Sequence, residues 1–295
     1  MSFSSRARLS VGAIVIAVGS SWVSAQQTPS IPYEPPKQFG GSITGAFEGW
    51  FDNPDGSHNF LVGYLNRSQK QAQDVPIGPN NRIEPGGPDM GQPTHFEPGR
   101  QTGVFIVQVP KSFSPEQKLT WTITANGQTT QIPLRLHRDY NVSPFADVAV
   151  GNKPPVLRLA ENGETVQGPV ALPGKAPTLS TSVGAPLTIP AWVDDDGKYS
   201  SGSNAPVRDN RSPVRLHWAK YRGPGKVTLE PENPKLEVSK GGKVDEPFSA
   251  KGTTIAKFSA PGEYMLHLLA NDYSGEGGNG EVCCWTSAYV KVSVK

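Results

Sequence analysis

Glycine and proline interrupt this chain so often that a long helix has little room to form. The chain has 295 residues, of which 32 are glycine and 29 are proline. The longest stretch without either residue is Glu281–Lys295, and its valines alternate with polar side chains. Alternation with period two is typical of a β-strand with one buried face. The sequence therefore predicts an all-β fold of short strands joined by many turns.

Charge and composition exclude several classes of protein. The 28 lysine and arginine residues nearly balance the 26 aspartate and glutamate residues. Nucleic-acid-binding domains carry a strongly basic surface, so we expect no nucleic-acid partner. Large aliphatic and aromatic residues stay just above the level at which chains become disordered, and little net charge opposes collapse. The chain is therefore expected to fold.

Residues 1–25 have the composition of a cleavable secretory signal peptide. Arg6 and Arg8 precede the apolar run Val11–Val23, which is shorter than the roughly 20 residues needed to span a bilayer. Small residues then end the segment at Ala25, as they do at a cleavage site. The alternative is an uncleaved membrane anchor.

Cleavage after this segment defines the expected mature protein. Removing its two arginines leaves 28 − 2 = 26 basic residues against 26 acidic ones. Residues 26–38 are polar and proline-rich, which predicts a flexible leader. We therefore expect a neutral protein that is secreted or held in the periplasm or at the cell surface, with no transmembrane span in the mature chain.

The segment Gly151–Pro155 marks a boundary between two domains, 39–150 and 151–295. Its two adjacent prolines predict a stiff, extended connector, and each side has an ordinary domain length. Alternating runs predict two tandem Ig-like β-sandwiches; the alternative is a single large β-domain. The predicted strands are Ala46–Phe51, Asn59–Asn66, Gly103–Val109, Leu119–Ala125, Gln128–Leu136, Val156–Leu159, Pro186–Val193, Val214–Tyr221, Thr254–Phe258, Glu263–Asp272 and Ala288–Val294.

A hairpin is predicted around Asn126-Gly127. This dipeptide tolerates the positive φ angles of a tight turn and lies between two alternating runs. Leu119, Trp121 and Ile123 share one face of the first run. Pro133 lies in the second run and cannot donate a ladder hydrogen bond, so that strand is expected at a sheet edge.

Several motifs of the second half follow one another in a recognisable order. They are Asn152–Val156, Trp192–Gly197, Val214–Trp218, Gly223–Val227 and Phe258–Asp272, followed by a strand of alternating valines. On these residues the second half, 152–295, resembles bacterial extracellular Ig-like modules of the PKD-like and cadherin-like kind. The resemblance implies an Ig-like β-sandwich. It departs from these modules in the insert Tyr199–Ser212 and in its cysteines, and the first half resembles no family.

Strand alternation supports the same fold for the second half. Trp218, Tyr264 and Leu266 fall on faces that we expect to be buried. Tyr264 follows Pro-Gly at the start of a strand, where the hydroxyl of a tyrosine corner bonds back to the chain.

One acidic cluster is a candidate calcium site. Asp194, Asp195 and Asp196 are consecutive, and Asp272 ends a strand that often neighbours this loop in the fold. Calcium takes six to eight oxygen ligands, so these four residues could hold it and rigidify the protein. The alternative is a solvated turn in which an aspartate caps backbone amides. No other cofactor is expected.

The only cysteines, Cys283 and Cys284, are adjacent. Thiols of exported proteins tend to oxidise, but neighbouring side chains of a strand point to opposite faces. Three states remain open: a vicinal disulfide, two separate thiols, or a bridge to another molecule.

The segment Asn80–Arg100 is interpreted as a long loop and as the first candidate for a binding surface. Loops of this length usually carry function; a stiff cover over one sandwich edge is the alternative. Its candidate binding residues are Arg82, Asp89, His95, Glu97 and Arg100. The expected partner is a protein or glycan of the cell envelope.

Catalysis finds little support in the sequence. The G-x-S-x-G motif of α/β-hydrolases is absent, and the five histidines show no zinc-binding spacing. His217 and His267 are expected to face outward from their strands. Glu48, Asp52 and Glu97 are conceivable paired carboxylates, and Trp50, Phe51 and Tyr64 are a conceivable aromatic platform for sugars.

The sequence therefore favours an exported, non-catalytic binding or structural module. Two alternatives remain. One is a hydrolase, with a glycan as its candidate substrate and its site at the 80–100 loop and the interdomain cleft. The other is a calcium-rigidified spacer.

Overall fold

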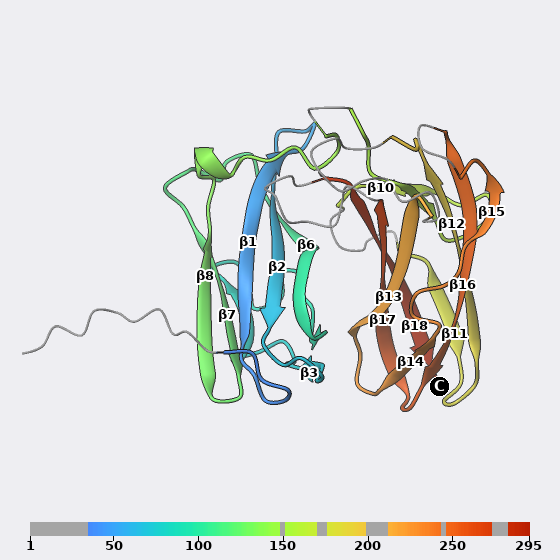
Figure 1. The fold of residues 1–295 in the computed structure, drawn as a ribbon. Helices are drawn as coiled ribbons and strands as arrows, with labels where there is room; N and C mark the ends of the chain where they lie inside the picture. Colours follow the sequence, from blue (N-terminus) through green and yellow to red (C-terminus); the bar gives the residue numbers. More distant parts are fainter. Residues whose placement is uncertain (1–34, 148–150, 170–175, 199–211, 243–245, 273–282) are drawn as a thin grey trace, which may run out of the picture. The chain divides into compact units, whose positions relative to one another are not determined.

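The computed structural model describes residues 35–147, 151–169, 176–198, 212–242, 246–272 and 283–295 (Figure 1). Within these residues the chain is built of strands, with a single 3-10 turn, η1 (Arg138–Tyr140). The predicted all-β sandwich fold is confirmed. The predicted signal peptide, most of the leader and nearly all of the insert 199–212 lie outside the described residues. No helix in the described part is long and apolar enough to cross a membrane.

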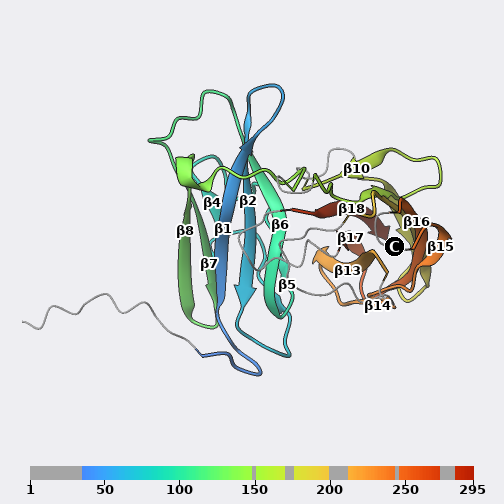
Figure 2. The same cartoon turned by 45° about the horizontal axis from the view of Figure 1, so that its top comes forward.

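The first half is a sandwich of two three-stranded sheets (Figures 1 and 2). One sheet has the order β1-β2-β6, the other has the order β4-β7-β8, and β3 pairs with β5 in a short ribbon. The strands are β1 (Ile43–Asp52), β2 (His58–Asn66), β3 (Gln73–Asp74), β4 (Asn81–Glu84), β5 (His95–Phe96), β6 (Gly99–Val109), β7 (Leu119–Ala125) and β8 (Gln128–Leu134).

Alternation places one face of each of these strands in the core. Leu119, Trp121 and Ile123 are buried along β7 as predicted. Trp121 packs against Phe96 and Phe105 from other strands. The interior of the first half is therefore an aromatic layer between its two sheets.

The predicted hairpin is present between β7 and β8. Asn126 and Gly127 have φ angles of 51° and 77°, the left-handed conformation that a two-residue hairpin turn requires. β8, which contains Pro133, lies at the edge of its sheet, as its missing N–H demands.

The second half is a sandwich of a six-stranded and a four-stranded sheet. The larger has the order β10-β9-β12-β16-β14, with β15 also paired to β16, and the smaller has the order β11-β18-β17-β13. The strands are β9 (Val156–Arg158), β10 (Thr165–Gln167), β11 (Thr178–Thr181), β12 (Leu187–Asp195), β13 (Val214–Arg222), β14 (Val227–Glu230), β15 (Glu237–Lys240), β16 (Phe248–Phe258), β17 (Gly262–Asp272) and β18 (Trp285–Val294).

This strand order is that of an Ig-like sandwich. β9, β12, β16 and β14 form the sheet of first, second, fifth and fourth strands, while β13, β17 and β18 form the other sheet. Trp218, Tyr264 and Leu266 are buried in its core as predicted. The Tyr264 hydroxyl donates to the carbonyl of Ala260 at 2.8 Å, which makes the expected tyrosine corner.

The outer face of the four-stranded sheet is also buried. Tyr221 and Tyr289 belong to the core cluster of the first half, and the Tyr289 hydroxyl donates to the carbonyl of Val104 at 2.8 Å. His267 faces away from the core of its own sandwich, as predicted, but it is not solvent-exposed: it is only 8% exposed. Its ring stacks on Tyr289, because β13, β17 and β18 present this face to the first half.

A third apolar cluster extends the same junction. Trp285 of β18 packs with Phe51, Leu61 and Ile106, which come from β1, β2 and β6 of the first half. The sheet β1-β2-β6 is therefore covered on both faces, which explains why nearly every residue of β2 is buried. By its contacts, Glu34–Lys295 forms one compact unit.

Candidate functional site

The segment Asn80–Arg100 is not the single long loop that its glycines and prolines suggested. It contains β4, which pairs with β7, and β5, which pairs with β3, and it runs into β6. The strands escaped prediction because they are short and β4 carries one apolar side chain, Ile83, that reaches the core. The longest irregular stretch is residues 85–94.

Residues 85–94 bind the end of β13 in the second half. Both carboxylate oxygens of Asp89 accept from Arg222, at 3.0 and 2.8 Å. Arg222 also donates through Nε to the carbonyl of Gln92 at 3.0 Å, and the Tyr221 hydroxyl donates to the carbonyl of Gly91 at 2.5 Å. The partner of the predicted binding residue Asp89 is thus another part of the same chain.

His95 lies in a second charged network at this junction. Its Nδ1 and the Nζ of Lys220 contact the same Asp74 oxygen, at 2.8 and 3.0 Å. His95 Nε2 lies 3.1 Å from a Glu97 oxygen. Burial opposes the charge on His95, but the hydrogen bonds to Asp74 and Glu97 outweigh it and raise the pKa of His95. Both carboxylates therefore favour the imidazolium form.

Arg100 pairs with Glu48 at an irregular point of β1. The ion pair joins Arg100 Nη2 to Glu48 Oε1, and the other Glu48 oxygen accepts from the backbone N–H of Gly103 at 2.6 Å. Burial raises the pKa of Glu48, while the charge and hydrogen bond of Arg100 oppose that rise. Glu48 thereby ties β1, at its bulge, to β6.

The predicted carboxylate pair for hydrolysis is divided among separate partners. Asp52 contacts His58 at 2.6 Å, Glu97 contacts His95, and Glu48 is held by Arg100. Each of the three carboxylates therefore has a different partner.

The aromatic platform predicted for sugars is wrong for two of its three members. Phe51 and Tyr64 are buried in apolar clusters, and Trp50 is partly buried, with its Nε1 donating to the carbonyl of His137 at 2.7 Å. These rings are amphipathic or apolar, so burial in the sandwich interior is more favourable for them than exposure at the surface.

Arg82 is the predicted binding residue that borders an open hollow. Its Nε donates to Glu84 Oε2 at 2.8 Å, and its Nη1 donates to the carbonyl of Pro79. The hollow has a volume of about 570 Å³. Its lining residues are Arg82, Glu84, Pro85, Gly86, Gly87, Pro88, Thr120, Thr122 and Gln131.

Asp194 and Asp196 each have a partner within the second half, and that of Asp196 is the backbone cap that the turn interpretation predicts. Asp196 Oδ1 accepts from the backbone N–H of Lys198 at 2.9 Å, and Asp194 binds Arg158 at 2.7 Å. Among the described residues, no three acidic, histidine or cysteine side chains form a group that could hold a metal ion.

Asp195 has a different environment. Its Oδ1 accepts from the N–H of Gly197 at 2.9 Å, whereas its buried Oδ2 has no hydrogen-bond partner among the described residues. Burial, with added repulsion from Asp272 and Asp196, raises the pKa of Asp195 to about 7. Asp272 in turn accepts from the side-chain amide of Asn152 at 2.9 Å.

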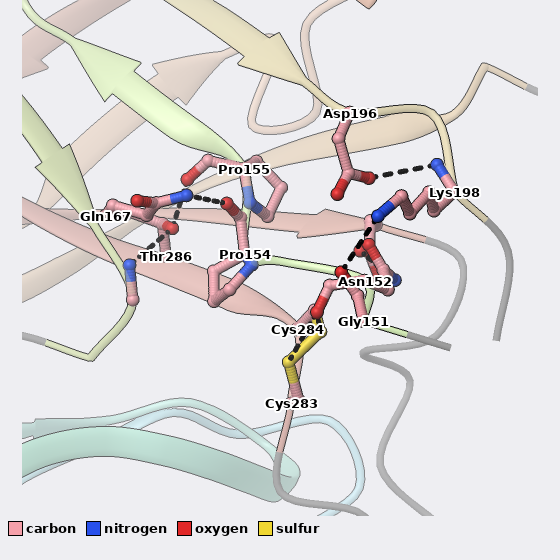
Figure 3. Close-up of a disulfide and its surroundings, with 12 residues drawn as sticks. Gly151, Asn152, Pro154, Pro155, Gln167, Asp196, Lys198, Cys283, Cys284 and Thr286 are labelled. Carbon is pink, nitrogen blue, oxygen red and sulfur yellow. Dashed lines mark hydrogen bonds between the residues drawn. A yellow bond between two sulfur atoms is a disulfide. The ribbon is translucent and has the colours of Figure 1, made fainter. Parts of the chain in front are cut away.

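Figure 3 shows Cys283 and Cys284 joined by a disulfide at the connector between the two halves. The Cys284 sulfur lies 3.5 Å from the carbonyl oxygen of Asn152. Asn152 is fully buried and also contacts Asp272. The connector is therefore packed between the disulfide and the acidic residue.

Sequence reasoning missed the residues of β13 that reach the first half. Lys220, Tyr221 and Arg222 are three consecutive large polar side chains at the end of an otherwise alternating strand. That break in alternation was the available signal. Their partners lie about half the chain away, so spacing could not identify them.

Comparisons with known proteins add little to this description. No family model and no curated protein sequence matches the chain. Among solved structures, it is similar to domains 4 and 5 of the S-layer protein SbsC, at 11% identity, over 86% of this chain and 97% of that one. The TM-score is 0.20, a level at which the likeness carries no argument about function.

Proposed function

We propose that this protein is an exported, non-catalytic binding or structural module of the bacterial cell surface or periplasm. The observation that carries the proposal is the use of the charged residues in and around segment 80–100. Asp89 is held by Arg222, and His95 shares Asp74 with Lys220. These ion pairs join the two sandwiches, so the charged residues stabilise the contact between the two halves.

The hydrolase alternative would require these carboxylates to leave their present partners. Glu48 is buried and accepts two hydrogen bonds, from Arg100 and from the Gly103 N–H. Glu97 contacts His95, which is itself hydrogen-bonded to Asp74. A general acid or base needs access to substrate atoms. The geometry favours the module.

Crosslinking in whole cells tests the proposal. The full-length gene is expressed in its own host, intact cells are treated with a crosslinker, and captured molecules are identified. We expect an exported chain joined to a protein or glycan of the envelope. Recovery of the chain alone would exclude the binding role and leave the spacer. Hydrolysis of an envelope glycan that is lost in Glu97→Gln would overturn the non-catalytic assignment.

A calcium-rigidified spacer is the second candidate, and Asp195 is the observation that favours it. The Asp195 Oδ2 is buried and has no hydrogen-bond partner in the part of the chain that the structure describes. Because the charge of Asp272 also acts on Asp195, a cation would stabilise both carboxylates. Calcium also accepts carbonyl oxygens as ligands, so two aspartates would suffice as its charged ligands.

A melting experiment decides between calcium and the capped turn. We expect millimolar calcium to raise the Tm of the wild-type protein and to leave that of Asp195→Asn unmoved. Asp194→Asn is the matched control, because Asp194 faces Arg158, and it should keep the calcium response. An unmoved wild-type Tm would reject the calcium spacer.

A further inference from the structure

The hollow beside Arg82 is floored by the outer face of the sheet β4-β7-β8. Cross-strand pairing sets Arg82 opposite Thr122, and Thr122 opposite Gln131, across the three strands. Glu84 lies opposite Thr120 in the next row on this face. Neighbouring side chains of a sheet face lie about 5 Å apart, so the floor is a grid of donors and acceptors.

The charges on this floor neutralise each other. Arg82 Nε and Glu84 Oε2 are 2.8 Å apart, and a second guanidinium nitrogen is bound by the carbonyl of Pro79. Within the described part of the chain, Arg82 Nη2 and Glu84 Oε1 make no hydrogen bond, so each still offers a donor or an acceptor. The hollow thus presents polar groups with no net charge, which disfavours ionic ligands.

Hydroxyl and amide groups complete the floor. Gln131 Nε2 lies 3.3 Å from the Thr122 hydroxyl, which orients both side chains. The Thr120 hydroxyl is the adjoining group. A ligand hydroxyl both donates and accepts, so it can satisfy any member of such a mixed grid.

The wall of the hollow, residues 85–88, is held in place from behind. Gln92 is fully buried; its Nε2 donates to the carbonyl of Pro88 at 2.6 Å, and its Oε1 accepts from the N–H of Met90 at 2.9 Å. A Cβ on Gly87 would meet no atom of the described residues within 4 Å, so the wall leaves bare backbone beside the floor. Such a preformed wall lowers the entropy cost of binding.

The wall also argues against an extended peptide as the ligand. Peptides commonly bind by adding a strand to a sheet edge. Here the Ile83 N–H at the outer edge of β4 is already taken by the carbonyl of Pro88 at 3.2 Å. The rings of Pro85 and Pro88 instead provide apolar surface next to polar groups, which matches a molecule with C–H faces and hydroxyl edges.

We propose that this hollow binds a neutral oligosaccharide. The inference rests on the proposed binding role and names its ligand class. Glu84, Thr120 and Gln131 contact the sugar hydroxyls, Arg82 positions Glu84, and the two prolines cover the C–H faces. Thr122 is only 3% exposed and positions Gln131 from beneath. The volume of about 570 Å³ lies in the range of small-ligand sites, roughly 300–1,000 Å³.

Threonine-methyl NMR of the full chain tests this proposal directly. The probes are maltotriose, cellotriose and triacetylchitotriose, with sialyllactose as the charged comparison and blocked trialanine as the peptide comparison. We expect at least one neutral trisaccharide to shift the Thr120 and Thr122 methyl signals, with a Kd of about 1 mM. Gln131→Ala and Glu84→Gln should each weaken binding by about five- to tenfold.

Thr129→Ala is the matched control, because Thr129 shares the strand and face of Gln131 but is not among the lining residues. It should bind as wild type does, and near-UV circular dichroism should show that all three variants fold. Absence of shifts at 10 mM of every neutral sugar, equal binding in all variants, or a response to sialyllactose or trialanine alone would overturn the inference. If the sugars fail while whole-cell crosslinking captures an envelope component, the proposed function stands without this site.

Discussion

Arg222 binds both carboxylate oxygens of Asp89, a residue 133 positions earlier in the chain. The two side chains are 22% and 49% exposed, so solvent screens the pair and its Coulomb energy is modest. The position of the pair in the fold is more informative than its energy. It connects the last residue of β13 in the second sandwich to residues 85–94 of the first.

Arg222→Lys should lower the free energy of unfolding by about 1 kcal/mol. Lysine loses the bidentate geometry and the bonds to the Gln92 carbonyl. Urea unfolding of Arg222→Lys, Asp89→Asn and the double variant should give a coupling energy of about 0.5 kcal/mol. Arg82→Lys serves as control, because the bonds of Arg82 remain within the first half. Equal costs for the two arginine substitutions would contradict the role assigned to Arg222.

Gly103→Ala should be far more costly than Gly99→Ala on the same strand. Both glycines have positive φ, 59° and 78°, so both substitutions carry a backbone cost of about 1 kcal/mol. A Cβ at Gly103 would also lie 2.2 Å from the Trp285 ring, whereas one at Gly99 would meet nothing within 4 Å. We expect Gly103→Ala to lower the free energy of unfolding by about 3 kcal/mol. Matching losses in urea unfolding would show that Trp285 does not press on β6.

Acid should weaken the junction through His267. Burial, with repulsion from His217, lowers the pKa of His267 from its ordinary 6.5 to about 3. Between these values the unfolded chain binds a proton that the folded chain does not, so the free energy of unfolding falls as the pH drops from about 6.5 to about 3. The full effect is up to about 5 kcal/mol.

Urea unfolding at a series of pH values measures how the free energy of unfolding changes with pH. His267→Phe keeps a ring beside Tyr289 and should flatten the pH dependence in that window. His217→Gln, at a residue bonded to Asn233, should leave most of it in place. His95 acts in the opposite direction, because its raised pKa adds stability that is complete below the unfolded pKa and lost as pH rises. If the pH dependence of the unfolding free energy were unchanged in His267→Phe, the claim that His267 is buried in its neutral form would be wrong.

Intact-mass analysis of the exported chain tests the vicinal disulfide. The structure joins the sulfurs of Cys283 and Cys284, so the monomer should be lighter than its reduced form by two hydrogen atoms. The Cys283→Ser variant should show no such difference. A full-mass wild-type monomer would mean two separate thiols, and a dimer that dissociates on reduction would mean an intermolecular bridge.

Sequence alternation predicted where the strands lie, but it did not predict which of their outer faces are covered. The alternation of Val290, Val292 and Val294 marked the core face of β18, and all three are buried. The same alternation puts Tyr289 on the opposite face of the strand, yet it is buried against the first half. Tyrosine and histidine suit both water and a hydrogen-bonded interior, so their presence on a strand does not reveal what covers it.

The contacts between the halves could not be derived from sequence spacing. The Asp89–Arg222 and Asp74–Lys220 pairs join residues 133 and 146 positions apart. Segment 80–100 was singled out for its charged residues, but charge alone does not say whether the partner is another molecule or the same chain. Asp89 is bound by Arg222 of the same chain, whereas Arg82, seven residues earlier, borders an open hollow.

The central claim is that the two sandwiches form one structural unit, fastened by residues first interpreted as an external binding loop. Native-state hydrogen exchange of the full chain, followed by mass spectrometry across increasing urea, tests it most directly. We predict that core amides of β2 in the first half and β17 in the second exchange through one opening with the same free energy and the same urea dependence. Two openings of clearly different free energy in the wild-type protein would show that the halves unfold independently, and would contradict the claim.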